Sequence, residues 1–502
     1  MRQPKNKFKT NKRYRGILAA ILCLAASLPA QDKPITSAVG DNFTLLGSMA
    51  HVASAGYWST GFTLVNTSTS PAQARLRMFG DGGAPFTPSF TTIGLGLPLN
   101  YGDVLTAPIA PNAMHVIETT GSTTIPVAVG SAQLTSNGPL SGFAVFRFNF
   151  NTQEAVVPLE TRQAASYYLP FDNTGNIDLG VALASVGGGA SVPLLIRDDA
   201  GQVIGSSSVN IPANGHTSFV LRQQYAATAN KRGTVEFQTP SGGQISVLGV
   251  RYTPPGTLTT IPVLANVDAS GGTMAHVASG GGWKTSVVLV NTGTNAAGAT
   301  VRYFDDAGSP LNLPLTFPQG APAVTASQVD RTLAAKASLV IDSEAPAATA
   351  VKTGSIQLTT NGNVGGFVIF RFQNNGQEAV VPLESRAAGS FVIAFDNSAG
   401  PLSGAPTTTG LATGVAVSNA AVQAAAVQVI LRDSDGTQIG TNTLNLAANA
   451  HQSFVLADQY PVTAGKRGTI EFVAPAGGKI SALGIRTITP QLTFTTLPPF
   501  AR

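Results

Sequence analysis

Residues 130–162 read GSAQLTSNGPLSGFAVFRFNFNTQEAVVPLETR, and residues 354–386 read GSIQLTTNGNVGGFVIFRFQNNGQEAVVPLESR. The two stretches align without gaps and are identical at 22 of 33 positions. Such similarity is too specific to result from shared composition. It indicates that the chain contains a tandem duplication.

The repeat continues on both sides of this stretch. Residues 49–54 return at 274–279, Trp58 returns as Trp283, and residues 231–234 return at 466–469. The spacing grows from 225 residues (49 to 274) to 235 residues (231 to 466), because about ten extra residues near 400–409 enter the second copy. The duplication therefore covers most of the chain.

Each copy also shows a fainter division into two related halves. In the first copy a strand pattern ends at Phe79 before a Gly/Asp turn, and another ends at Arg197 before a similar turn. We predict an all-β protein of tandem antiparallel β-sandwich modules, two copies of a two-sandwich unit. The predicted segments are a signal peptide (1–30), a linker (31–44) and four sandwiches (45–163, 164–266, 267–387 and 388–502), the third repeating the first and the fourth the second.

The strand assignments rest on alternation of apolar and polar residues. Residues 192–197 alternate in this way, and residues 427–431 do so at the matching place in the second copy. Residues 234–238 place Val235 and Phe237 opposite polar neighbours, which predicts one buried and one solvated face. The one helical segment that we expect is short, at 332–338.

This pattern resembles the tandem immunoglobulin-like or fibronectin-type-III-like sandwich modules of secreted bacterial surface proteins. The resemblance is architectural and extends over the chain after its leader. It implies a fold class and no binding residues.

The N-terminus has the features of a secretory leader. Seven Lys or Arg residues precede an apolar run at 16–28, and Ala30 offers a small residue for cleavage. This run of 13 residues is shorter than the ~20 that a membrane-spanning helix needs. We therefore expect an exported protein, located extracellularly, at the cell surface or in the periplasm, without an integral membrane span once processed.

Cleavage changes the charge and the cysteine content. The whole chain has 30 basic and 25 acidic residues, and removal of the leader leaves 23 basic against 25 acidic. The excess of basic residues therefore belongs to the leader, and we predict no nucleic-acid partner. Cleavage also removes Cys23, the single cysteine, which excludes disulfides and thiolate metal sites from the processed chain.

Acidic turns are the candidate metal sites. Calcium binds six to eight oxygen atoms, often from Asp at alternate positions. Hairpin turns favour the same residues, because Asp bonds to its own backbone and Gly adopts positive φ. We favour the turn interpretation, predict no cofactor, and keep calcium as the alternative at Asp433, Asp435, Asp198, Asp199, Asp305 and Asp306.

Other candidate residues give no catalytic site. Glu154 and Glu160 lie six residues apart, about 20 Å along an extended strand, whereas paired glycosidase carboxylates lie about 5–9.5 Å apart. His216 shares a strand face with Ser218, so we expect it at the solvent side. Trp58 and Trp283 are either surface residues that stack against a ligand or caps of their cores.

We therefore expect a non-enzymatic exported protein that uses repeated modules for binding, adhesion or spacing, with a protein or glycan partner at the cell surface. The alternatives are a secreted hydrolase, for example a carbohydrate-active one with a site built from loops, and a fibre-forming structural protein. We also expect residues 31–266 and 267–502 to fold independently, with a modest, polar interface between them.

Overall fold

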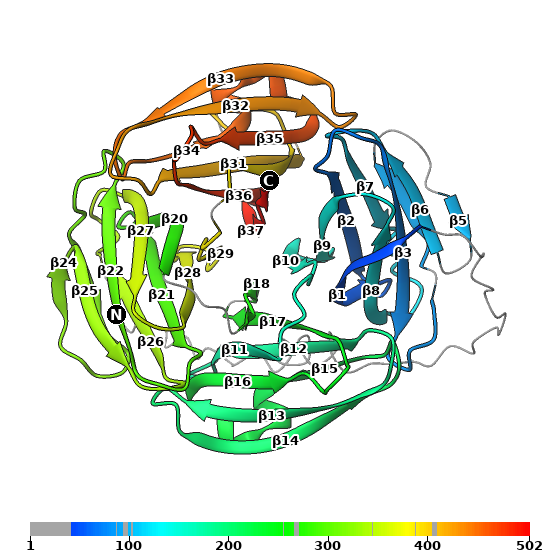
Figure 1. The fold of residues 1–502 in the computed structure, drawn as a ribbon, viewed down its shortest axis with the longest axis horizontal. Helices are drawn as coiled ribbons and strands as arrows, with labels where there is room; N and C mark the ends of the chain where they lie inside the picture. Colours follow the sequence, from blue (N-terminus) through cyan, green and yellow to red (C-terminus); the bar gives the residue numbers. More distant parts are fainter. Residues whose placement is uncertain are drawn as a thin grey trace, which may run out of the picture.

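The computed structural model describes residues 42–502 except 87, 94–98, 102–103, 255, 266–270, 344, 387 and 404–408. The described residues form eight antiparallel sheets, which confirms the predicted all-β class. Figure 1 shows four units, each built from two sheets, arranged in chain order around a common centre. The predicted signal peptide, most of the linker and most of the joint near residue 266 lie outside the described residues.

Unit 1 has the sheets β1-β8-β3-β6-β5 and β10-β9-β2-β7-β4. Its strands are β1 (Thr44–Ser54), β2 (Trp58–Asn66), β3 (Ala72–Gly80), β4 (Phe90–Ile93), β5 (Leu99–Tyr101), β6 (Val104–Ile109), β7 (Met114–Thr119), β8 (Ala128–Ser136), β9 (Leu140–Phe148) and β10 (Gln153–Pro158).

Unit 2 has the sheets β14-β13-β16-β11-β19 and β15-β12-β17-β18. Its elements are β11 (Ser166–Asp172), β12 (Asp178–Ser185), β13 (Ala190–Asp198), β14 (Val203–Ile211), β15 (His216–Val220), α2 (Leu221–Gln224), η1 (Ala226–Thr228), β16 (Arg232–Gln238), β17 (Ile245–Thr253), β18 (Thr257–Ile261) and β19 (Leu264–Ala265).

Unit 3 has the sheets β20-β27-β22-β25 and β24-β23-β26-β21-β28-β29. Its strands are β20 (Gly271–Ser279), β21 (Trp283–Asn291), β22 (Ala297–Asp305), β23 (Leu313–Thr316), β24 (Val324–Ala326), β25 (Gln328–Leu333), β26 (Ser338–Ser343), β27 (Lys352–Thr360), β28 (Val364–Phe372) and β29 (Glu378–Pro382).

Unit 4 has the sheets β33-β32-β35-β30-β38 and β34-β31-β36-β37, the order found in unit 2. Its elements are β30 (Ser390–Asp396), β31 (Gly410–Asn419), β32 (Ala425–Asp433), β33 (Gln438–Leu446), β34 (His451–Val455), α3 (Leu456–Gln459), η2 (Pro461–Thr463), β35 (Arg467–Val473), β36 (Ile480–Thr489), β37 (Thr493–Leu497) and β38 (Phe500–Ala501).

The core of each unit lies between its two sheets, and alternation along the strands supplies it. In β13, Val192, Leu194 and Ile196 are all buried, as predicted, and the matching apolar residues of β32 are buried too. The prediction of a short helix at 332–338 is wrong. These residues contain the end of β25, a turn with Lys336 at a φ of +62°, and the start of β26.

The second face of β16 is not solvated, contrary to our expectation. Glu236 is buried, accepts a hydrogen bond from the Tyr168 hydroxyl (2.9 Å) and forms an ion pair with Arg197 (2.5 Å). Lys336 of unit 3 reaches the same hydroxyl, with its Nζ 2.6 Å away. The neighbouring unit therefore covers a face that would be solvated in an isolated sandwich.

Four junctions of one kind connect neighbouring units around the ring. In each, a carbonyl oxygen in the turn after β3, β13, β22 or β32 accepts a hydrogen bond from a backbone N–H of the next unit. The pairs are His216 to Asp81 (3.3 Å), Ser338 to Asp199 (2.9 Å), His451 to Asp306 (3.2 Å) and Met114 to Ser434 (3.0 Å). Because the fourth joins unit 4 to unit 1, the ring is closed.

A glycine of positive φ makes each junction turn possible. Gly436, in the turn after β32, has a φ of +89°, and a Cβ there would lie 2.2 Å from the carbonyl oxygen of Pro111 in unit 1. A side chain at this position would therefore strain its own backbone and push unit 1 away.

We expect Gly436→Ala to lower the free energy of unfolding by about 3 kcal/mol or more, because it adds a steric clash to the ~1–2 kcal/mol cost of a left-handed alanine. Gly477→Ala is the matched control. Gly477 has a φ of +75°, with nothing within 4 Å of the added Cβ, so only the backbone cost applies. Chemical denaturation of both variants measures the difference. Equal losses would show that the junction does not contribute to stability.

Candidate binding clefts between the two halves of the chain

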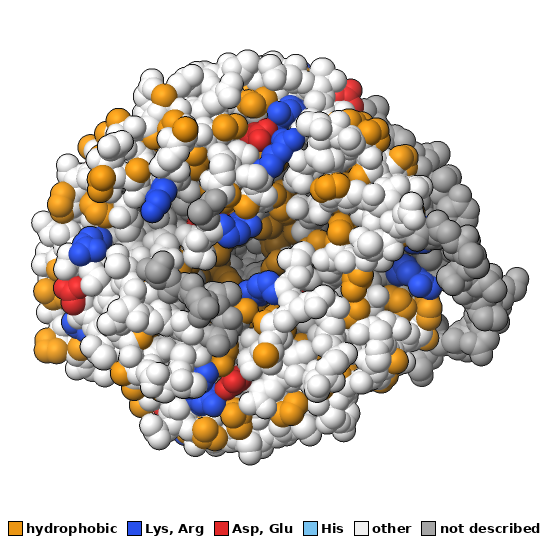
Figure 2. Space-filling view, in the orientation of Figure 1, with side chains coloured by type: hydrophobic (Ala, Val, Ile, Leu, Met, Phe, Trp, Pro, Cys, Tyr) orange, Lys and Arg blue, Asp and Glu red, His pale blue; other side chains and the backbone are white. Residues whose placement is uncertain are grey.

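Two related cavities lie where the first half of the chain meets the second. Cleft A, of about 270 Å³, lies between unit 1 and unit 4, and cleft B, of about 200 Å³, lies between unit 2 and unit 3. Figure 2 shows a hollow near the middle of one face, with basic side chains at its rim. Each cleft has one wall from the first half of the chain and one from the second, so neither could be predicted from one half alone.

The strands β10, β18, β29 and β37 position these clefts. Each is the edge strand of its sheet, and the four lie at the centre of the ring (Figure 1). Threonine side chains link them: Thr260 donates to the carbonyl of Val156 (2.6 Å), and Thr496 donates to the carbonyl of Val380 (2.7 Å). The ring thus satisfies polar groups that an isolated edge strand would expose.

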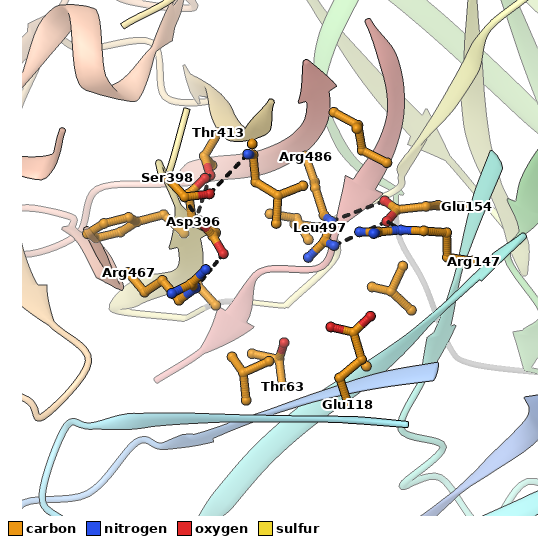
Figure 3. Close-up of a pocket in the computed structure, with 18 of the residues that line it drawn as sticks. Thr63, Glu118, Arg147, Glu154, Asp396, Ser398, Thr413, Arg467, Arg486 and Leu497 are labelled. Atoms are coloured by element: carbon orange, nitrogen blue, oxygen red, sulfur yellow. Dashed lines mark hydrogen bonds and ion pairs between the residues drawn. The ribbon is translucent and has the colours of Figure 1, made fainter. Parts of the chain in front are cut away.

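Glu154 of β10 is the centre of the charged network in cleft A. Arg147, its cross-strand neighbour on β9, lies 2.8 Å away, and the Arg486 Nε of unit 4 lies 3.1 Å away. Figure 3 shows both guanidinium groups directed at this carboxylate, with Glu118 on the facing wall. Since only 3% of the Glu154 side chain is exposed, this is a nearly buried ion-pair network across the unit 1–unit 4 interface.

A second ion pair lies on the unit 4 wall of cleft A. Arg467 of β35 lies 2.6 Å from Asp396 at the end of β30. Burial alone lowers the pKa of the Arg486 side chain. The carboxylates of Glu154, Asp396 and Glu118 more than offset this effect, so its pKa lies above the ordinary arginine value. Arg486 therefore remains a cation inside the cleft.

Cleft B repeats this network with the equivalent residues of units 2 and 3. Glu378 of β29 lies 3.1 Å from Arg251 and 3.8 Å from Arg371. Asp172 lies 3.3 Å from Arg232 and 3.6 Å from Arg251. Burial raises the pKa of Asp172, but Arg251, Thr174 and Arg232 together bring it below its ordinary value.

The two clefts differ on one wall. In cleft B, Lys284 forms an ion pair with Asp342 (3.0 Å). At the corresponding strand positions of unit 1, the hydroxyl of Ser59 donates to Glu118 of cleft A over 3.3 Å. The two clefts therefore share the network around Glu154 and Glu378 and differ in the polar contact beside it.

Apolar side chains from both halves form the floors of the clefts. Phe143 and Val145 of unit 1 belong to the same buried cluster as the core of unit 4, and the ring of Phe143 stacks on Phe500 with centroids 6.1 Å apart. Phe367 and Ile369 of unit 3 likewise join the core of unit 2. The interface between the halves is therefore apolar at its base, and our expectation of a modest, polar interface is wrong.

We expect Glu154→Gln to lower the free energy of unfolding by about 3 kcal/mol, because the substitution leaves Arg147 and Arg486 without their counter-charge in a nearly buried site. Asp330→Asn is the control. Asp330 is an exposed carboxylate that accepts from Thr300 (2.6 Å), so the loss should stay within about 1 kcal/mol. Denaturant titration of the two variants tests the difference. A Glu154→Gln loss as small as that of the control would contradict the assigned role of the network.

Buried histidines connect the units within each half. The Nδ1 of His216 lies 2.7 Å from Asp81, and its Nε2 lies 3.1 Å from the Nδ1 of His51. His276, His451 and Asp306 repeat this chain, at 3.1 Å and 2.8 Å. If Nδ1–H of His216 donates to the carboxylate, Nε2 must accept from His51, which fixes both tautomers.

The prediction that His216 lies at the solvent side is wrong. Its exposure is 2%, because unit 1 packs over the strand face that Ser218 shares with it. Burial lowers the pKa of His51 well below its ordinary value, and the nearby His216 lowers it further. Burial lowers the pKa of His276 to about 3, with a further contribution from His451.

The aspartates that we considered as calcium ligands bond to their own turns or to the junctions. Asp198 accepts from the backbone N–H groups of Ala200 and Gln202, and Asp305 accepts from those of Ala307 and Ser309. Among the described residues, no group of three or more His, Cys, Asp or Glu side chains is arranged to hold a metal ion.

The remaining calcium candidates likewise bond either within their own turns or at the junctions between units. Asp433 and Asp435 both accept from the N–H of Thr437, the carbonyl of Asp199 accepts the N–H of Ser338, and the carboxylate of Asp306 bonds to His451 and Thr353. No two of the candidate turns come together, since each lies at a different junction. Calcium binding stays a prediction that the structure does not test.

The two tryptophans lie at the ends of their cores. Trp58 is 4% exposed and packs on Phe148, with ring centroids 4.7 Å apart. Trp283 is half-buried and contacts Phe372 and Phe494. Glu154 and Glu160 do not form one site: Glu154 lies in cleft A, whereas Glu160 pairs with Arg162.

Four of the cleft arginines were not among the residues that we selected from the sequence: Arg147, Arg251, Arg371 and Arg486. Arg232 and Arg467 follow a lysine in both copies and could be read as anion contacts, but solvated charges were the preferred interpretation. A signal was present, because Arg147 returns as Arg371 inside the aligned repeat, and Arg232 returns as Arg467. Arg251 and Arg486 also occupy matching places, on β17 and β36. The role of these arginines depends on contacts between residues far apart in the sequence, such as that of Arg486 with Glu154.

A scan against protein-family models finds no match to this chain, and a search of curated proteins finds no similar sequence. Among the described residues, no helix is long and apolar enough to cross a bilayer.

Proposed function

We propose that this chain is a non-enzymatic exported binding protein whose two clefts are its ligand sites. The observation that carries the proposal is the recurrence of one network, a carboxylate held by two guanidinium groups above an apolar floor, at both joints between the halves. The likeness of the units to immunoglobulin-like or fibronectin-type-III-like modules of secreted bacterial surface proteins, and export itself, belong to this proposal.

The geometry favours binding over hydrolysis. Glu154 lines cleft A and Glu378 lines cleft B, and each is engaged by two arginines. A glycoside hydrolase of the usual two-carboxylate kind needs a carboxyl group placed to donate its proton to the leaving group. Both carboxylates instead accept from arginines that the cleft walls hold in place, and such fixed donors and acceptors beside apolar side chains suit recognition.

Closure of the ring supports binding as well. The walls of each cleft come from two units that several independent contacts hold together. Besides the junction turns, the hydroxyl of Thr493 donates to the carbonyl of Thr152 (3.3 Å) between units 4 and 1, and that of Thr259 donates to the carbonyl of Glu378 (3.1 Å) between units 2 and 3. A site whose walls are already fixed loses little conformational entropy when a ligand enters. A pair of such sites on one molecule can also bind a repetitive ligand with increased avidity.

A thermal-shift screen of amino acids, organic acids, nucleotides, saccharides and short peptides tests the proposal. At least one class should stabilise the wild type and fail to stabilise the double variant Arg467→Gln, Arg232→Gln, which alters one side chain in each cleft. Product release should be followed in parallel. Ligands that act equally on both proteins, or a ligand consumed by the wild type alone, would contradict a non-enzymatic role for the clefts.

A further inference from the structure

The charges inside the clefts restrict the class of ligand. We propose that each cleft binds one unit of a neutral saccharide, an inference that rests on the proposed binding function. Three observations carry it: the balance of charge, the unused hydrogen-bonding capacity of the paired groups, and the size and apolar floor of the cavities.

Among the residues that the structure describes, acidic and basic side chains line each cleft in equal numbers. Cleft A has three of each sign: Glu118, Glu154, Asp396, Arg147, Arg467 and Arg486. Cleft B has four of each: Asp172, Asp178, Asp342, Glu378, Arg232, Arg251, Lys284 and Arg371. A charged ligand would add an ion that no excess charge offsets, and desolvation of an ion costs several kcal/mol. A neutral ligand leaves the balance unchanged.

The paired groups keep hydrogen-bonding capacity for a ligand. Arg467 uses its Nε on Asp396, and Arg486 uses Nε and one Nη on Glu154. A guanidinium has five N–H donors and a carboxylate about four acceptor positions, so both have capacity beyond these pairs. A hydroxyl group donates and accepts at once, and can bridge a guanidinium and a carboxylate. A polyhydroxylated molecule therefore matches an alternation of fixed donors and acceptors.

The size and floor of the clefts point to one sugar unit. Their volumes of about 270 and 200 Å³ lie far above the ~10–15 Å³ that one water needs, and below the ~300–1,000 Å³ of pockets for drug-sized ligands. The floor of cleft A includes Phe143, Val145 and Leu497, against which the C–H face of a sugar ring can pack. Polar walls above an apolar floor match the two-sided character of a pyranose.

Isothermal titration of the exported protein with matched sugars tests the inference. The neutral panel is glucose, galactose, mannose and N-acetylglucosamine, and the charged analogues are glucuronate and glucosamine. At least one neutral sugar should bind at two sites per chain, one for each cleft, with its charged analogues weaker by about tenfold or more.

Variants assign the sites. Arg467→Gln should remove or weaken by about tenfold the site in cleft A alone, and Arg232→Gln the site in cleft B, so that each lowers the stoichiometry from two to one. Arg162→Gln, which lies outside both clefts, is the control and should leave two sites.

The outcomes separate this inference from the proposed function. Preferential binding of glucuronate or glucosamine, lost in the cleft variants, would overturn the neutral-saccharide inference while the clefts remained binding sites. Absence of binding across the neutral panel would also overturn it, and the broader thermal-shift screen would then decide the proposed function. Sugar binding that neither cleft variant alters would show that the clefts are not the sites.

Discussion

Expressed separately, residues 31–266 and 267–502 are expected to be far less stable than the whole chain, and to reassociate when mixed. The reason is the apolar interface between the halves. The core of unit 4 includes Phe143, Val145 and Met114 of unit 1, and the core of unit 2 includes Phe367 and Ile369 of unit 3. Each such side chain contributes about 1.5–3 kcal/mol when buried, so the summed loss is comparable with the ~5–15 kcal/mol stability of an ordinary domain.

Thermal melts of each half and size-exclusion chromatography of the mixture measure this effect. The separate halves should melt at least ~10 °C below the whole chain or aggregate, and the mixture should elute as a one-to-one complex. Halves that carry Phe143→Glu and Phe367→Glu are the control, since a buried charge at each interface should prevent reassociation. Two monomeric halves, each as stable as the intact protein, would refute the prediction.

Acidification from pH 7.5 to pH 5 is expected to destabilise the protein strongly. The pKa of His276 in the folded protein is about 3, below its ordinary value of 6.5, so the unfolded chain binds its proton first. This contribution to stability is complete above about pH 6.5 and is lost as the pH falls toward 3. The loss of stability amounts to about 2 kcal/mol at pH 5 and approaches about 5 kcal/mol below pH 3. His51, whose pKa is also lowered, adds a loss of the same sign.

Denaturant unfolding at several pH values, on the wild type and on the double variant His51→Asn, His276→Asn, tests this prediction. The Asn amide can replace the Nδ1–H donor without titrating, so the variant should keep its stability at pH 7.5 and lose much less at pH 5. Asp306, whose pKa is lowered chiefly by its hydrogen bond with His451, contributes only below about pH 4. An unchanged pH dependence in the variant would exclude the histidines as its source.

Local patterns in the sequence predicted the strands, because alternation along a strand depends on its nearest neighbours. The apolar residues of β13 and β32 lie in the core as the pattern requires. The same patterns failed for His216 and Glu236, where alternation identified the face but could not show that another unit covers it. A face that is polar in one sandwich becomes an interface in a closed ring.

The candidate site was less predictable than the fold. We considered the distance between Glu154 and Glu160 along one strand only. The residue that makes Glu154 part of a cleft is Arg486, which lies 332 residues away in the sequence. Comparison of the two copies could have selected the arginines, because they recur, but not their pairing. Similarly, the acidic turns were recognisable as turns, while their contact with the next unit depends on ring closure.

The fourth junction also restricts how the protein can reach its native state. It joins the unit made first to the unit made last, and the hydroxyl groups of Thr152 and Thr493, 341 residues apart, lie 3.2 Å from each other. Contacts of such sequence separation close a very long loop and form late, which slows folding. Until the last strands have emerged, unit 1 exposes Phe143 and Val145 to any other chain. The molecule is therefore most exposed to aggregation during its synthesis, when unit 1 is present and unit 4 is not.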